Sequence, residues 1–177
     1  EDMPRVMSIG RLDLNSEGLL LLTNDGELKR RLELPSTGWL RKYRVRVNGR
    51  PEDTVFAPLR KGITIEGENF QPMTVTLDRI QGANAWLTVG IREGRNREVR
   101  RAMAAIGLVV NRLIRVSYGP FRLEDLPPGA VQEVRPGLPV IVLSGFIGHF
   151  TTDDLRSGGV RRVLQKPVGG SDLAEAI

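Results

Sequence analysis

Within residues 41–48, positions 42–47 alternate between cationic and apolar side chains. The odd and even positions form two sets: Tyr43, Val45 and Val47 against Lys42, Arg44 and Arg46. Successive side chains of a β-strand point to opposite faces of its sheet, so this run predicts a strand with one buried face and one cationic face. Such a strand needs partners, and a sheet is therefore the first structural expectation.

Further short runs of apolar or alternating residues, separated by Gly, Pro, Asn and Asp, are typical of strands joined by turns. We expect strands at residues 6–9, 19–23, 63–65, 73–77, 85–91, 109–116 and 131–134. Helices are expected at residues 26–34, with Asp25 as cap, at 51–59 and at 96–106, with Gly107 as C-cap. Many strands and few helices predict an α+β fold, built on a mixed or antiparallel sheet with flanking helices.

Composition excludes several classes of site. The 177 residues contain no cysteine, which excludes disulfides and thiolate chemistry, and the single His149 excludes a histidine-rich metal site. Lys and Arg exceed Asp and Glu by 26 to 21, which favours a nucleic-acid partner or, equally, a solvated charged surface. No apolar run reaches the roughly 18 residues of a membrane span and no signal peptide is evident, so we expect a cytoplasmic protein.

The pattern changes near residue 136. Residues 139–143 form an unalternated apolar run, typical of a strand buried on both faces, and a strand–helix–strand–helix pattern of parallel α/β type follows. We therefore expect two domains, residues 1–135 and residues 136–177. The second resembles the last third of a two-component receiver domain, with Ser144 and Lys166 at its switch-hydroxyl and phosphate-contacting positions. It supplies no phosphoacceptor aspartate, so no phosphorelay partner is expected. Alternatively, the tail covers an open edge of the sheet of the first domain.

A turn near the N-terminus contains one isolated carboxylate. Asp13 follows Gly10 and lies between Arg11 and Asn15, just before the apolar run of residues 19–22. An aspartate in this setting can be a nucleophile, a general base or a turn cap, and the residues alone favour a cap.

Two further segments contain residues suited to binding. Lys42-Tyr43 places an aromatic ring in the cationic strand, where a tyrosine is either core or a platform for base stacking. Five arginines lie between Arg92 and Arg101, where a strand leads into the third helix. A helix N-terminus attracts anions, and arginines there hold phosphates; a solvated basic helix face is the alternative.

Together, these segments resemble the bacterial small-loop pseudouridine synthases that act on ribosomal RNA, and among them the branch that modifies the large subunit. The matching segments, in the family's order, are residues 10–26, 42–43, 93–101, 111–116 and 119–129. The resemblance covers about residues 5–135.

The resemblance implies an RNA-modifying isomerase that converts a uridine of ribosomal RNA to pseudouridine, with neither metal nor organic cofactor. Asp13 matches the carboxylate that attacks ribose C1′ or abstracts a proton, and Arg100 matches its cationic partner. Tyr43 matches the platform for the flipped base or a proton acceptor. RNA contacts are implied for a further set of polar residues: Arg11, Asn15, Lys42, Arg95, Asn96, Arg97 and Arg101.

Family members carry a small RNA-binding domain and one further strand ahead of the Gly-Arg-Leu-Asp segment. Here Asp13 lies twelve residues after Glu1, so we expect both to be missing and a sheet edge to be exposed. The alternative function is a catalytically impaired RNA-binding module that retains the fold. A signalling receiver is a third alternative, which only the tail favours.

Overall fold

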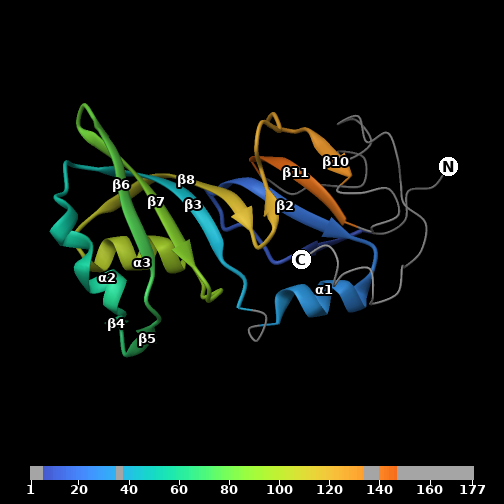
Figure 1. Cartoon of the computed structure of the whole chain (residues 1–177), viewed down its shortest axis with the longest axis horizontal. Helices are drawn as coiled ribbons and strands as arrows, with labels where there is room; N and C mark the ends of the chain where they lie inside the picture. Colours follow the sequence, from blue (N-terminus) through green and yellow to red (C-terminus); the bar gives the residue numbers. More distant parts are fainter. Residues whose placement is uncertain (1–5, 35–37, 134–139, 147–177) are drawn as a thin grey trace. The chain divides into compact units, whose positions relative to one another are not determined.

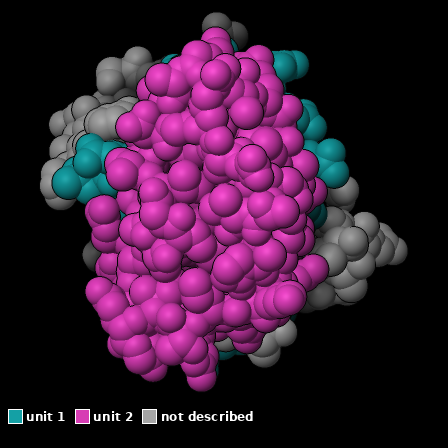
Figure 2. Space-filling view, turned by 90° about the vertical axis from the view of Figure 1, so that its left-hand side faces the viewer, with its two compact units in different colours: residues 1–37, 120–177 teal, residues 38–119 magenta. Residues whose placement is uncertain are grey.

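A computed structural model of the chain describes residues 6–34, 38–133 and 140–146. The chain divides into two compact units (Figure 2): unit 1 comprises residues 1–37 and 120–177, and unit 2 comprises residues 38–119. In the described part of each unit the strands pair antiparallel and the helices are few (Figure 1). The expected α+β class is confirmed.

The described part of unit 1 contains an antiparallel sheet and the helix α1. Its strands lie in the order β1 (Met7–Ile9), β2 (Glu17–Thr23), β11 (Val140–Phe146) and β10 (Val131–Glu133), and the two-residue β9 (Phe121–Arg122) also belongs to this unit. Helix α1 (Gly26–Glu33) contributes Leu28 and Leu32 to the buried set. Asp25 caps it as expected, because its carboxylate accepts hydrogen bonds from the N–H groups of Glu27 and Leu28 at 2.9 and 3.1 Å.

The strand expected at residues 139–143 is present as β11, but its pairing differs from the expected parallel arrangement. It runs antiparallel to both β2 and β10, with Val140 opposite Thr23 and Phe146 opposite Glu17. The expectation of a parallel α/β unit was wrong for this strand, because β2 is itself apolar and offers an edge in the same sheet. The helices and strand expected beyond it, with Lys166, lie outside the described residues, and the boundary near residue 136 stays a prediction.

Unit 2 is built around β3 (Arg41–Asn48), which has the expected bounds. The sheet order is β8 (Val109–Tyr118), β3, β7 (Asn84–Ile91) and β6 (Thr74–Gln81), and each neighbouring pair is antiparallel. The predicted parity is confirmed: Tyr43, Val45 and Val47 are buried, whereas Lys42 and Arg44 are exposed.

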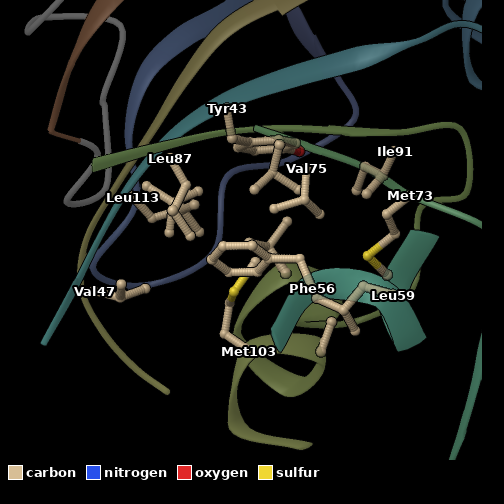
Figure 3. Packing of buried hydrophobic residues seen from close by; sticks show 14 of the residues in the cluster. Tyr43, Val47, Phe56, Leu59, Met73, Val75, Leu87, Ile91, Met103 and Leu113 are labelled. Atoms are coloured by element: carbon tan, nitrogen blue, oxygen red, sulfur yellow. The ribbon is translucent and has the colours of Figure 1, made fainter. Parts of the chain in front are cut away.

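Helices cover one face of this sheet and close its core. The 3₁₀ turn η2 (Asp53–Phe56), α2 (Ala57–Lys61) and α3 (Glu98–Ala105) bring Phe56, Leu59 and Met103 against the buried side chains of the strands (Figure 3). The helix expected at residues 51–59 begins later, because Pro58 favours the first turn of α2. A hairpin of β4 (Ile63–Ile65) and β5 (Glu68–Phe70) completes the unit, and β5 was not expected from its short polar sequence.

Gly119 offers a test of packing at the end of β8. Its φ is +55°, and a Cβ there would lie 2.7 Å from ring atoms of Trp39. Gly119→Ala should therefore lower the free energy of unfolding by more than the about 1–2 kcal/mol that a left-handed conformation costs by itself. Gly107→Ala is the matched control, since Gly107 has a φ of +81° and open space around it. Urea denaturation measures both, and equal losses would contradict the steric account.

Candidate active site

Helix α1 anchors the turn that presents Asp13. Gly10 adopts a left-handed φ of +65°, and its N–H donates to Oε1 of Glu33 at 2.7 Å. Lys29 pairs with the same carboxylate from one turn earlier on α1. After the turn, the N–H of Ser16 donates to the carbonyl of Asp13 at 2.9 Å. The Asp13 side chain is only partly buried, so a fixed backbone presents an accessible carboxylate.

Tyr43 lies at one end of the unit 2 core, beside Val75 (Figure 3). It is 9% exposed, and its hydroxyl is hydrogen-bonded by Arg115, its register partner on β8. Burial raises the pKa of the Tyr43 phenol, and the Arg115 cation only partly offsets this effect. Tyr43 is therefore a neutral phenol at neutral pH, held by a cation, and suits a packing platform better than a proton acceptor.

Arg115 is the centre of a buried polar cluster, here called the Tyr43 cluster: Tyr43, Arg115, Tyr118 and Arg41. Arg115 is 2% exposed, and its Cζ lies 5.3 Å from the centre of the Tyr118 ring. Arg41 lies 4.7 Å from the same centre, and its Nη2 donates to the Tyr118 hydroxyl at 3.0 Å. Burial lowers the pKa of Arg115, yet a guanidinium stays charged at neutral pH. The core of unit 2 thus contains a cation directed at Tyr43.

Sequence reasoning missed Arg115, although a signal was present. Leu113 is buried on β8, and Arg115 follows two positions later with the same parity. A charged residue at an inward-facing position of a half-buried strand is costly unless it is hydrogen-bonded, and such residues are therefore candidates for a functional site.

Glu98 is a second buried charge that was not singled out. It is 4% exposed at the start of α3, and its Oε2 accepts a hydrogen bond from the N–H of Arg95 at 2.9 Å. Burial is the largest influence on Glu98 and raises the pKa of its carboxyl group above the ordinary value. This carboxylate secures the loop that enters α3.

Two of the arginines expected to contact RNA are paired with carboxylates. Arg95 and Arg101 form ion pairs at 3.0–3.3 Å with three acids: Glu66, Glu68 and Glu93. Both guanidinium groups also lie over the Phe70 ring, 5.3 and 4.9 Å from its centre. They fasten α3 to the β4–β5 hairpin, and an RNA role for them stays a prediction.

The other candidates of unit 2 have separate settings. Nη1 of Arg100 donates to the carbonyl of Val110 at 3.0 Å, which ties α3 to β8. Asn96 and Arg97 are exposed, and Arg97 caps α3 with a left-handed φ of +50°. Lys42 is exposed on the sheet face opposite Tyr43, so these neighbours in sequence do not share a site surface.

Asp13 belongs to unit 1, with Arg11 and Asn15, which are both exposed. Tyr43 and Arg100 belong to unit 2. Within the described residues, no three His, Asp or Glu side chains gather closely enough to hold a metal ion. The same part of the chain has no helix long and apolar enough to cross a membrane.

The Tyr43 phenol should titrate above its ordinary pKa of 10.0 in the folded protein. Arg115→Gln should raise the pKa of Tyr43 further, because the cation beside the hydroxyl favours the phenolate. Alkaline titration of the tyrosinate absorbance measures this, and since the chain has two tyrosines, Tyr43→Phe assigns the transition. A lower Tyr43 pKa in Arg115→Gln would contradict the geometry.

Glu98 should make the protein less stable as pH rises. Because the pKa of Glu98 is raised above 4.5 in the folded state, its stabilising contribution is full below pH 4.5 and is lost as pH rises through the raised value. Glu98→Gln keeps an oxygen for the Arg95 N–H and removes the titration. As the pH rises above 4.5, the unfolding free energy of the wild type should therefore fall relative to that of Glu98→Gln. Urea denaturation of both proteins over a range of pH measures this difference. Glu52→Gln, at an exposed acid, controls for the loss of one charge.

Comparison with known proteins places the chain in a family. The profile of the family described as RNA pseudouridylate synthase matches residues 1–105, which include Asp13, Tyr43 and Arg100. A Rickettsia bellii protein named "Uncharacterized RNA pseudouridine synthase" is 50% identical over 132 residues, 75% of this chain and 57% of that protein. "Ribosomal large subunit pseudouridine synthase B" of Haemophilus influenzae is 46% identical over 133 residues, 73% of this chain and 37% of that protein.

A solved structure described as a crystal structure of pseudouridylate synthase is similar to this fold. It is 31% identical, with a TM-score of 0.61, and the match covers 68% of this chain and 51% of that one. The chain thus spans 57% or less of the length of each of these three proteins. It belongs to the RNA pseudouridylate synthase family.

Proposed function

We propose that this chain isomerises a uridine of large-subunit ribosomal RNA to pseudouridine in the cytoplasm. The observation that carries the proposal is the family match over residues 1–105, because the three expected catalytic residues all lie within it. The relative from Haemophilus influenzae, named for the large ribosomal subunit, supports this choice of RNA.

The reaction breaks the bond between uracil N1 and ribose C1′ and forms a bond between C5 and C1′. N1 gains a proton and C5 loses one, so the product is an isomer of the substrate. Asp13 is the carboxylate of this reaction, acting at C1′ or on a proton. Its turn suits the role because the bond from Gly10 to Glu33 fixes the backbone while the side chain stays accessible.

Tyr43 supports the flipped uracil. Val75 and the core pack against its ring, and Arg115 hydrogen-bonds its hydroxyl. A rigid, uncharged aromatic surface suits stacking, because uracil presents a flat π-face and charge at the phenol would add a desolvation cost. Arg115 is a positioning residue in this arrangement.

Arg100 is the proposed cationic partner of Asp13, and Arg11 the residue that contacts the RNA where the base has left the stack. The bond from Arg100 to the Val110 carbonyl uses Nη1. A guanidinium forms strong, often bidentate hydrogen bonds with a carboxylate, which suits the proposed role.

Release of tritium from C5-labelled uridine in large-subunit ribosomal RNA tests the proposal. The wild type should release tritium, and Asp13→Asn should lower the rate at least about 10²-fold, since the loss of an acid–base group alone costs that much. Asp125→Asn, at an exposed aspartate elsewhere in unit 1, should keep the wild-type rate.

Two results would reject the proposal. Absence of release by the wild type, in protein that still binds the RNA, would favour the alternative of a binding module without catalysis. Equal rates for the wild type and Asp13→Asn would remove Asp13 from the reaction.

A further inference from the structure

The sheet face of unit 2 opposite α2 and α3, here called the outer face, contains a row of cations. Arg46 on β3 lies opposite Arg112 on β8 and opposite Trp86 on β7, and Trp86 lies opposite Arg79 on β6. Register partners on neighbouring strands point to the same face. The row therefore consists of Arg112, Arg46, Trp86 and Arg79 on four neighbouring strands. Arg44 lies on the same face, two residues before Arg46 on β3.

Trp86 arranges these arginines. Its side chain is on the outer face but is only 8% exposed. Arg44 and Arg46 lie over the indole, with Cζ atoms 5.0 and 5.8 Å from the ring centre. The indole N–H donates to the Gln81 side chain at 3.2 Å, which fixes the ring. Cation–π contact thus holds two guanidinium groups over the fixed indole ring. Because these groups are already ordered, binding a ligand costs them less conformational entropy.

The positive charge of the outer face is balanced less than the positive charge of α3. One carboxylate, that of Asp78, lies on this face and accepts a hydrogen bond at 2.8 Å from Thr88, the register partner of Arg44. In the part of the chain that the structure describes, no carboxylate forms an ion pair with Arg44, Arg46 or Arg79. By contrast, Arg95 and Arg101 together contact three acids. Arg46 lies opposite Arg112, and its Nε donates to Oδ1 of Asn111 at 2.7 Å, so a neutral amide rather than an acid holds it on this face.

We propose that the outer face binds the phosphate backbone of RNA, as a contact surface separate from the Tyr43 side of the sheet. The inference rests on the proposed function for the identity of the partner, because the RNA substrate of the proposed reaction is itself a polyanion. Arginines hold phosphates in bidentate fashion, and such contacts position an RNA without reading its sequence. Because Trp86 is covered by arginines, the face lacks an open aromatic platform and is suited to backbone rather than bases.

Salt dependence of binding tests this surface. The full chain is titrated with purified large-subunit ribosomal RNA over a series of salt concentrations, and the slope of log K against log salt is compared. Arg44→Gln with Arg79→Gln should reduce the slope by about 1.4–1.8, because each phosphate contact contributes about 0.7 in single strands and 0.9 in duplexes. Arg44→Lys with Arg79→Lys should largely keep it.

Arg30→Gln with Lys61→Gln is the matched control, since it removes two cations from α1 and α2 rather than from the sheet. It should leave the slope at the wild-type value. Should the first double variant fail to fold, Arg79→Gln alone spares the contact of Arg44 with Trp86 and should reduce the slope by about 0.7–0.9.

An unchanged slope in the outer-face variants, or an equal change in the control, overturns the inference. So does a wild type that does not bind the RNA, or an outer face that binds vesicles of anionic lipid while RNA binding is unaffected. The slope is measured without turnover, so the inference and the isomerase function fail separately. Normal tritium release with an unchanged slope rejects only the outer face. A reduced slope without tritium release rejects only the isomerase.

Discussion

The two-residue period of β3 is the constraint on which unit 2 depends. β3 pairs along its whole length with β7 in one register and with β8 across two register shifts, so the partners of its buried residues lie on the buried face as well. The core contains Tyr43, Val45 and Val47 with their register partners. The opposite face contains Lys42, Arg44 and Arg46 with theirs. One strand thereby separates an apolar side, which contains the Tyr43 cluster, from a cationic side. A slip of one residue would exchange the two sides.

The buried charges of unit 2 are costly, and their placement is informative for that reason. Arg115 and Glu98 are almost fully buried, and a buried ionic group is often no better for stability than an apolar one of similar size. Each is hydrogen-bonded, Arg115 to Tyr43 and Glu98 to the N–H of Arg95. They fix a tyrosine and the entry to α3, two segments that the family resemblance assigns to the reaction. Both are therefore candidates for a role in the proposed function.

The arginines of this chain divide into two groups that the sequence does not distinguish. Arg95 and Arg101 belong to an arginine-rich segment of the sequence, yet both form ion pairs with Glu66 or Glu68 of the β4–β5 hairpin. Those on the outer face come from separate strands and meet only across the sheet. Local charge density therefore does not show which arginines are paired with carboxylates or which ones gather on one face, because contacts between distant segments decide both.

The sequence by itself determined the features that depend on local chemistry. The alternation of β3, the Asp25 cap of α1 and the motif around Asp13 were all predictable, because a period, a cap and a turn involve neighbouring residues. Short polar strands such as β5 carry no such period. Only the tertiary structure decided the antiparallel pairing of β11 with β2, the burial of Arg115 against Tyr43 and the row beside Trp86. Each of these joins segments far apart in the chain, and their contact depends on strand order and register, which no local pattern encodes.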